Sequence, residues 1–335
     1  MVLAVYDGDP KWIEIELDFK DEEFFNVGFL EFTGEEKIFP VDGQHRVEGI
    51  KAALKENQEL KSEEIPVIFI GHKKNAEGMQ RTRRLFNTLN RYAKPVSFND
   101  IIALDEDDIA AITTRMLIEN FSLFLGDRII SNKIKAIPET NKTGFTSVIT
   151  LYQCNRLLLE HWLKKTKPKK KVDIYIKMRP NDNDLAEFYS FCQSFWDQLV
   201  NQITDIKNYL LDVGPEPTAK YRNKEEGGNL LFRPIGLIPF VMSVLAIVEK
   251  SDLDYEQTLV LMNNCNLGLD SKPWPQVLWN PFSKKMLRAD NVLVSKLLLY
   301  LAKRSLLNGE EILRLKHDYA DKISLPFTDD IFNDL

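Results

Sequence analysis

KIFPVDGQHRVEGIKAAL, the sequence of residues 37–54, decides how the first part of the chain folds. Its apolar start ends in an Asp-Gly pair and the pattern of an amphipathic helix follows directly, which predicts a strand, a tight turn and a helix. The turn is occupied by Asp42, Gly43, Gln44, His45 and Arg46. Because packing does not require this combination and strand-to-helix turns often bind ligands, we interpret the turn as a candidate binding site.

This turn has a structural and a functional interpretation. In the structural one, Asp42 caps the helix and Gly43 permits the turn, which leaves the other three residues unexplained. In the functional one, His45 and Arg46 contact phosphate oxygens at the helix N-terminus, where backbone amides and the helix dipole favour an anion. Asp42 would then hold a metal ion, a ribose hydroxyl or a water to be activated. We favour the functional interpretation, with Asp42, His45 and Arg46 as the candidate catalytic residues.

The composition predicts a soluble globular protein. The 335 residues are 44% hydrophobic and 28% charged, which is ordinary for this class and long enough for two domains. No run approaches the ~18 consecutive apolar residues of a membrane span, and the N-terminus lacks the pattern of a signal peptide, so we expect a cytoplasmic protein without membrane contact. Cys154, Cys192 and Cys265 are widely separated, and we interpret them as reduced core residues.

The residues around the turn predict a small sheet. Alternating apolar residues predict strands at 2–6 and 12–17, joined as a hairpin, and a second strand pair at 27–32 and 37–41. The apolar run at 65–70 predicts a buried strand after the helix. Strand, turn, helix and strand would then form a βαβ-like unit whose ligand edge lies at the turn.

The rest of the chain is predicted to be mainly helical. A helix at 79–92 would bury Met79 and end at Pro95. One of its polar faces carries Arg81, Arg84, Thr88 and Arg91, and the neighbouring face carries Arg83, Asn87, Asn90 and Lys94. A solvated basic surface is the alternative, but asparagines are poor helix formers and usually serve a contact. Further helices are predicted at 100–120, 146–163, 185–211, 235–251, 254–264, 289–308 and 310–320.

Basic residues are concentrated in two segments, although the chain as a whole is acidic. It has 44 Lys and Arg against 50 Asp and Glu, a net charge of -6, which argues against a non-specific DNA coat. Segment 72–94 has seven basic residues and one acid, and segment 164–179 has eight basic residues and one acid. The candidate nucleic-acid contacts in these segments are Arg81, Arg84, Lys167, Lys169, Lys170 and Lys171.

Other enzyme classes lack their motifs. The chain has no P-loop, Rossmann or α/β-hydrolase signature, and the spacing of its four histidines predicts no metal site. His161, beside Trp162 in an apolar helix, is interpreted as a structural residue. A nuclease is a weaker hypothesis, because Asp42 alone is too little for a two-metal site.

Three strings, spread over most of the chain, resemble a known family. VDGQHRVEGIKAAL, FNTLNRYAKPVS and GGNLLFRPIG are similar to the motifs of the DGQHR-domain family. Its best-known branch comprises the DndB proteins of DNA phosphorothioation clusters, and another branch resembles a partner protein of deazaguanine DNA-modification systems. Family members usually carry a helix and a strand ahead of the segment that corresponds to residues 2–6. This chain begins without them, so part of the first domain is expected to be absent.

The resemblance implies an α+β fold and a bound nucleotide. Because the family is distantly similar to ParB and sulfiredoxin, it implies a small mixed-sheet domain at 1–96 and a mainly helical domain with a basic loop at 97–330. ATP or another NTP is the implied cofactor, with Mg²⁺ as an option. The implied phosphate cradle comprises Gly43, Gln44, His45 and Arg46, and the supporting motif comprises Asn87, Asn90, Arg91 and Lys94. Gly228 and Arg233 match a C-terminal motif to which we assign no role.

Two functional hypotheses follow. The first is a nucleotide-binding protein with NTPase activity coupled to DNA modification or phage defence, of the phosphorothioation or deazaguanine type. The second is a DNA-binding regulator that represses a modification operon without turnover. The expected partners are DNA, proteins of the modification or defence cluster and, as one option, further copies of the chain. The first hypothesis requires that Arg46 and Asn90 line one cleft.

Overall fold

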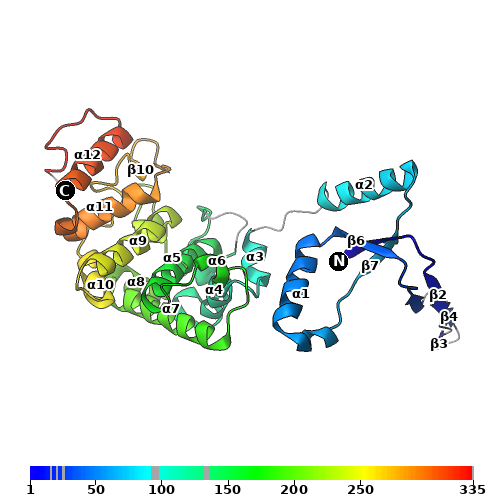
Figure 1. The fold of residues 1–335 in the computed structure, drawn as a ribbon. Helices are drawn as coiled ribbons and strands as arrows, with labels where there is room; N and C mark the ends of the chain where they lie inside the picture. The colour runs from blue at the N-terminus through cyan, green and yellow to red at the C-terminus, as the bar shows by residue number, and fades with distance from the viewer. Residues whose placement is uncertain (16, 20–21, 25–26, 92–97, 132–135, 334–335) are drawn as a thin grey trace. The chain divides into compact units, whose positions relative to one another are not determined.

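The computed structural model describes residues 1–333 except 16, 20–21, 25–26, 92–97 and 132–135. Side chains at 17–19, 22–24, 44–45, 86–91 and 100 also lie outside the description. The chain divides into two compact units, Met1–Pro95 and Val96–Leu335. The first contains small sheets and the second is mainly helical, which confirms the predicted α+β class (Figure 1).

The first unit is built on a three-stranded sheet. Its order is β6 (Lys37–Asp42), β1 (Val2–Tyr6) and β7 (Ile68–Gly71), with β1 antiparallel to β6 and parallel to β7. Two small hairpins complete the strands, pairing β2 (Lys11–Glu14) with β5 (Gly28–Glu31) and β3 (Leu17–Phe19) with β4 (Glu22–Phe24). The buried centre of the sheet comes from Ala4, Val5 and Val41.

Both predicted strand pairings are wrong. The strand at 2–6 pairs with β6 and β7 rather than with the next strand along the chain, and β5 pairs with β2 rather than with β6. Alternation shows that a segment is a strand, whereas long-range contacts choose its partner. The strand predicted as buried at 65–70 begins only at Ile68, whose side chain is 64% exposed, because β7 is an edge of the sheet. Since β6 and β7 flank β1 and run in opposite directions, they do not form a βαβ unit.

The helices of the first unit are α1 (Gln44–Glu56), the 3₁₀ turn η1 (Gln58–Ser62) and α2 (Ala76–Arg91). Helix α1 begins and ends where the sequence predicts, and the N–H of Asn57 donates to the Ala53 carbonyl at its end. The Asn75 side chain accepts from the Gly78 N–H at 2.8 Å at the start of α2. Met79 is 45% exposed, so the prediction that it is buried is wrong. The predicted stop at Pro95 lies outside the described residues.

The second unit is a layered assembly of helices. They are α3 (Phe98–Leu104), α4 (Ile109–Asn120), α5 (Val148–Thr166), α6 (Val172–Tyr175), α7 (Asp182–Gln202), α8 (Thr204–Leu211), α9 (Pro234–Lys250), α10 (Tyr255–Asn263), α11 (Asn291–Lys303) and α12 (Gly309–Ile323). Short strand pairs join β8 (Ile129–Ile130) to β9 (Thr146–Ser147) and β10 (Trp279–Asn280) to β11 (Lys285–Met286). Single 3₁₀ turns are η2 (Ser122–Phe124), η3 (Gly126–Arg128), η4 (Lys220–Arg222), η5 (Leu230–Phe232) and η6 (Arg304–Leu306).

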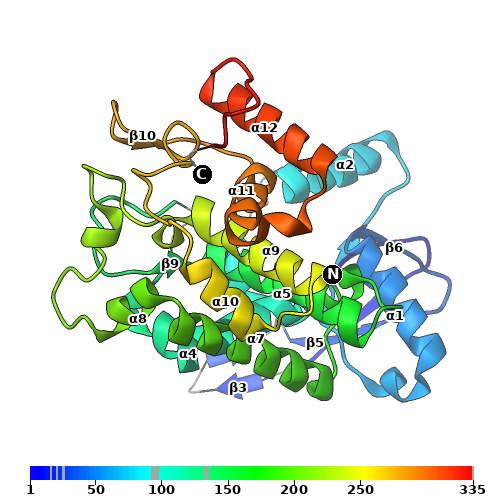
Figure 2. The same ribbon diagram turned by 90° about the vertical axis from the view of Figure 1, so that its left-hand side faces the viewer.

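Helix α9 lies at the centre of this unit, with α5, α10 and α11 around it (Figure 2). It is apolar on all sides, as a helix buried all round must be, and Leu237, Phe240, Val241 and Val244 are fully buried. The aromatic stripe of α7 is core, as predicted, with Phe188 and Trp196 fully buried. Cys154 and Cys192 are buried core residues as well. None of the described helices combines the length and apolar composition of a membrane span.

Two predicted long helices are each broken into two. The helix predicted at 100–120 stops at Leu104, and α4 starts anew behind Asp108. One Asp108 carboxylate oxygen accepts from the Ala110 and Ala111 N–H groups at 2.8 and 3.2 Å, and the other accepts from the Tyr152 hydroxyl at 2.6 Å. The helix predicted at 185–211 breaks at Ile203 between α7 and α8. At Ile203 the apolar periodicity continues across the break, so periodicity alone does not reveal it, whereas the break before α4 coincides with the acidic run 105–108.

Candidate phosphate-binding site

The turn between β6 and α1 is shaped by Gly43. Its φ of +90° lies in the left-handed region, where a residue with a Cβ is strained. A Cβ at this position would also lie 3.1 Å from Cγ of Met1. The buried Val41 anchors the strand before the turn, and the Gly43 carbonyl accepts from the Val47 N–H at 3.0 Å to start the helix. The backbone of the turn therefore requires glycine at position 43, as the structural interpretation supposed.

The N-terminus of α1 has no side-chain cap. Gly43 is the N-cap residue, and the first turn contains no acidic side chain. The Asp42 side chain makes no hydrogen bond or ion pair with any described residue, so the structural interpretation in which it caps the helix is wrong. Asp42 and Arg46 are both exposed beside the uncapped amides. An open helix N-terminus with an adjacent guanidinium is suited to an anion.

The supporting motif on α2 falls largely outside the description. The backbone of α2 packs against β6, the strand that leads to the turn. However, the side chains of Gln44, His45, Asn87, Asn90 and Arg91 and the whole of Lys94 are not among the described parts of the chain. The cleft shared by Arg46 and Asn90 therefore stays a prediction. No cluster of three or more metal-binding side chains occurs within the described residues.

An aromatic cavity of about 450 Å³ occupies the other end of the sheet in the first unit. Tyr6 pairs with Lys37 at this end, whereas Val2 pairs with Asp42 at the end of the turn. Tyr6, Phe39 and His72 pack edge to face with centroids 5.5–5.8 Å apart. His72 Nδ1 lies 2.7 Å from Thr82 Oγ1 of α2. No sequence pattern indicates this cavity, because the three rings come from three separate strands or strand ends.

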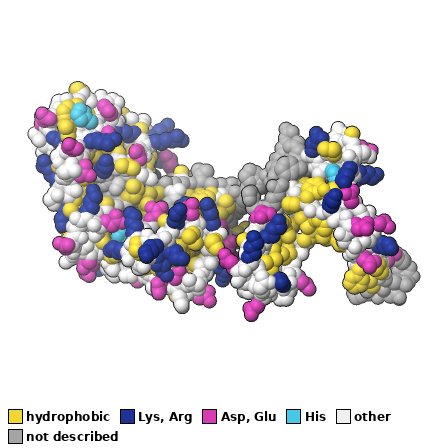
Figure 3. Space-filling view, viewed as in Figure 1, with side chains coloured by type: hydrophobic (Ala, Val, Ile, Leu, Met, Phe, Trp, Pro, Cys, Tyr) yellow, Lys and Arg dark blue, Asp and Glu magenta, His cyan; other side chains and the backbone are white. Residues whose placement is uncertain are grey.

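The candidate nucleic-acid contacts differ in their exposure and in whether they already form an ion pair. Arg81 and Arg84 are exposed on α2, and Lys169, Lys170 and Lys171 are exposed in the turn before α6. These five form no ion pair with any described residue. Lys167 instead pairs with the buried Asp184 and lies 5.4 Å from the Trp162 ring centroid. Lys and Arg side chains (dark blue in Figure 3) are interspersed with acids on both units, in keeping with the mildly negative net charge.

The GGNLLFRPIG motif forms a tight bend ahead of α9. Gly227 and Gly228 both have a positive φ, +81° and +83°. A Cβ on Gly228 would lie 2.0 Å from the Tyr221 carbonyl oxygen, which accepts from the Asn229 N–H at 2.9 Å. Arg233 then precedes Pro234, the first residue of α9. The glycines of the motif are therefore required by the backbone.

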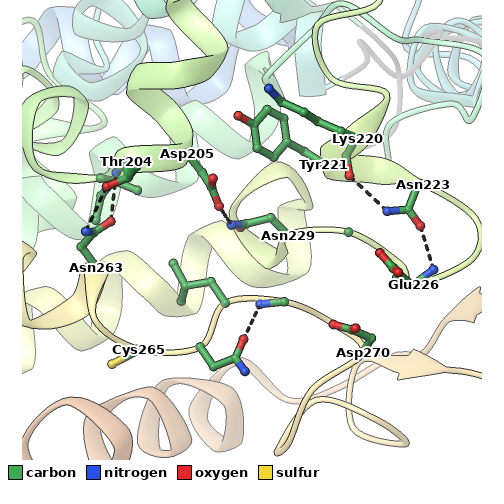
Figure 4. A pocket seen from close by; sticks show the side chains of 15 residues that line it. Thr204, Asp205, Lys220, Tyr221, Asn223, Glu226, Asn229, Asn263, Cys265 and Asp270 are labelled. Carbon is green, nitrogen blue, oxygen red and sulfur yellow. Dashed lines mark hydrogen bonds between the residues drawn. The ribbon is translucent and has the colours of Figure 1, made fainter.

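A polar pocket of about 410 Å³ lies on one side of this bend (Figure 4). Its asparagine side chains have hydrogen-bond partners within the pocket. Asn229 donates to Asp205 at 2.6 Å, and Asn263 bridges the N–H and hydroxyl of Thr204 at 2.9 and 3.1 Å. Asn223 likewise accepts from the Glu226 N–H at 2.7 Å. Because these groups already have partners, the pocket is explained by structural hydrogen bonds.

Comparison with known proteins supports the resemblance seen in the sequence. A family model described as DndB, DNA-sulfur modification-associated, matches residues 4–291 and so spans most of both units. No curated protein and no solved structure matches the chain.

Proposed function

The chain belongs to the DndB family, which is associated with DNA-sulfur modification, and on this premise we propose that it is a nucleotide-binding protein of a DNA-sulfur modification system. The proposed site is the β6–α1 turn, with the nucleotide phosphates on the uncapped amides of α1 and beside Arg46. The observation that carries the proposal is the open N-terminus of α1 behind a left-handed glycine. ATP or another NTP is the proposed ligand, bound with or without Mg²⁺.

The size of these interactions shows that α1 alone is insufficient. A charge at a helix N-terminus contributes about 0.3–1 kcal/mol, and a hydrogen bond to a charged group about 1.5–3 kcal/mol. Micromolar affinity needs about 8 kcal/mol. The turn and Arg46 would therefore supply part of the binding energy. We assign the remainder to the supporting motif Asn87, Asn90, Arg91 and Lys94.

Hydrolysis of the nucleotide is a separate step that Asp42 could serve. Its exposed carboxylate has no partner among the described residues and lies in the sequence directly before the phosphate-binding amides. It could orient a water or hold Mg²⁺. Phosphate release in the presence of each NTP, with and without Mg²⁺, measures this step independently of binding.

Isothermal titration calorimetry with the four NTPs tests the binding proposal. We expect the double variant Asp42→Ala, Arg46→Ala to bind at least about tenfold more weakly than the wild type, the loss of roughly one charged hydrogen bond. Lys51→Ala is the matched control, since Lys51 is an exposed cation of the same helix that pairs with Glu48 at 2.8 Å. If no NTP binds the wild type, or if the double variant binds as tightly as the control, the proposal is wrong.

A DNA-binding regulator is the second candidate. The exposed Arg81, Arg84 and Lys169–Lys171 favour it, because they have no ionic partner in the described parts of the chain. Each phosphate contact contributes about 0.9 to the slope of log affinity against log salt. Arg81→Ala, Arg84→Ala should lower that slope by about 1.8 in gel-shift or fluorescence titrations with duplex DNA. Salt-independent binding, or none, would remove this candidate.

A further inference from the structure

A small cavity of the second unit has an unusual charge. It has a volume of about 230 Å³ and lies between residues 136–142, the segment 222–224, Arg233 and the β10–β11 hairpin. The cationic side chains on its wall are Lys142, Arg222, Lys224, Arg233, Lys284 and Lys285, against Glu139 as the acid on the wall. Glu139 pairs with Lys224 at 2.8 Å, and Lys284 pairs with Glu225. Two of the cations are thereby neutralised.

The two arginines of the cavity are not neutralised. Arg222 is only 6% exposed, and no described carboxylate pairs with it or with Arg233. Residues 132–135, which lie outside the description, read Asn-Lys-Ile-Lys and so contain no carboxylate. Burial and the nearby charge of Arg233 lower the pKa of Arg222 to about 10, and burial lowers the pKa of Arg233 against the opposing effect of the Glu139 carboxylate. Both remain cations at neutral pH and repel each other.

Three buried donors around this cavity also have no acceptor. Arg222 donates through Nη2 to the Asn141 carbonyl at 3.0 Å and to Thr218, but its Nη1 has no partner among the described residues. Arg233 donates to the Gly227 carbonyl at 3.1 Å, while its Nε is unpaired. The indole N–H of the buried Trp279 is unpaired as well. Native proteins leave few buried donors unpaired, and these three belong to residues that line one cavity. The side chains around the cavity therefore lack an acceptor.

We propose that this cavity binds a phosphate group, with Arg222, Arg233 and Trp279 as its donors. Guanidinium groups suit phosphate because their planar donors match its oxygens. Two arginines that form no ion pair with a described carboxylate would be neutralised by a dianion, which favours a terminal phosphate over the singly charged phosphodiester of a DNA backbone. The small volume also excludes a duplex. The source is therefore inorganic phosphate, a mononucleotide or a 5′-phosphate at a strand end.

This proposal goes beyond the nucleotide site of the first unit and is tested without it. The full chain carrying Asp42→Ala, Arg46→Ala is titrated with sodium phosphate against sodium chloride of equal ionic strength. Thermal unfolding and tryptophan fluorescence follow the titration, since a ligand of the folded state raises its melting temperature. We expect saturable stabilisation by phosphate. If phosphate stabilises the wild type but not this double variant, it binds at the first unit, which overturns the present proposal and supports the first.

Three variants in that background decide whether the cavity is the site. Trp279→Phe keeps an aromatic ring in place and removes the indole N–H. Arg233→Lys keeps the positive charge and removes the planar guanidinium donors. Each variant should weaken phosphate binding about tenfold. Arg115→Lys is the control, because Arg115 is a half-buried arginine whose two terminal nitrogens both have acceptors, namely the Ile102 and Asp105 carbonyls and Glu106. Unchanged affinity in both Trp279→Phe and Arg233→Lys would overturn the proposal.

The source of the phosphate is settled by three further titrations. Adenosine monophosphate, a short oligonucleotide with a 5′-phosphate and the same oligonucleotide without it are compared with inorganic phosphate. If the source is a strand end, the 5′-phosphate should increase oligonucleotide affinity at least about tenfold, the contribution of a charged hydrogen bond. If the source is a small molecule, adenosine monophosphate or inorganic phosphate should bind by itself. Equal binding of the two oligonucleotides, with no binding of the small phosphates, would contradict it.

Discussion

The helices α1 and α4 begin in opposite ways. At α4, Asp108 accepts from two first-turn N–H groups and is itself held by the Tyr152 hydroxyl, all within the core. At α1, Gly43 offers no side chain, and the neighbouring Asp42 and Arg46 are exposed. Every helix has the same unpaired amides at its start. Helix α4 satisfies them with Asp108, whereas the first turn of α1 has no side-chain cap. The proposed phosphate site depends on this difference.

Removing the cap of α4 should have the largest effect. Asp108→Ala leaves the Ala110 and Ala111 amides and the buried Tyr152 hydroxyl without their acceptor, so we expect a loss of about 2–3 kcal/mol in the free energy of unfolding. Urea unfolding followed by tryptophan fluorescence measures it, because Trp12 is the sole tryptophan of the first unit and the other four are in the second. A loss below about 0.5 kcal/mol would mean that the two helix starts do not differ as described.

Replacing the glycine at the start of α1 should have an intermediate effect. Gly43→Ala places a Cβ at φ +90° and 3.1 Å from Met1, so we expect about 1–2 kcal/mol of destabilisation. Hydrogen exchange of the α1 amides reports it locally. Gly49→Ala is the control of opposite sign, since a Cβ there meets nothing within 4 Å and alanine should stabilise the helix by about 0.5–1 kcal/mol. Equal effects of the two variants would show that the left-handed turn carries no strain.

The conservative substitution Asp108→Asn should lower the free energy of unfolding less than Asp108→Ala does, and its effect should depend on pH. Asp108→Asn retains an oxygen for the cap and removes a buried charge, so we expect a loss under about 1 kcal/mol. Burial raises the pKa of Asp108 above 3.8. The folded state then holds the proton more tightly than the unfolded state, and this contribution is present below pH 3.8 and lost as the pH rises through the folded pKa. In urea titrations the free energy of unfolding of the wild type should therefore increase relative to that of Asp108→Asn as the pH falls from 7 to 4. A difference between the two proteins that stays constant with pH would contradict this.

Asp42→Ala should have the smallest effect on stability. Asp42 is exposed and its side chain makes no described hydrogen bond, so we expect the free energies of unfolding and of α1 amide exchange to change by less than about 0.5 kcal/mol. Nucleotide affinity or hydrolysis should nevertheless fall, because the proposed role of Asp42 is in ligand chemistry. A stability loss as large as that of Asp108→Ala would show that Asp42 caps α1 after all.

Local signals in the sequence predicted the β6–α1 junction well. The Asp-Gly pair, the apolar stripe from Val47 and the terminal Asn57 each act within a few residues, and α1 has the predicted start and end. The strand partners could not be predicted, because β1 pairs with segments that lie more than thirty residues away. The break before α4 did have a local signal, since the acidic run 105–108 ends in an N-cap residue, but the apolar periodicity on both sides hid it.

No sequence pattern predicts that Arg222 is buried and Arg233 half-buried. Arg222 lies in a polar stretch, TAKYRNKEEGG, that is typical of an exposed loop. Its burial depends on Asn141 and Thr218, which come from elsewhere in the chain or from the preceding turn. Arg233 was noticed only through the resemblance of its motif. Charge burial is a property of tertiary packing, and sequence patterns record which residues are apolar rather than which charges become enclosed.

The contact between Lys167 and Asp184 has a practical consequence for handling the protein. Trypsin does not cut readily between Lys167 and Pro168, so the exposed Lys169–Lys171 turn is the expected cleavage point. A cut there would leave Lys167 on one fragment and Asp184 on the other, still joined by their ion pair and by the packing of Trp162 against Tyr175 and Phe188. The two fragments should elute together in gel filtration. The turn is therefore a suitable place for a protease site or a spectroscopic label.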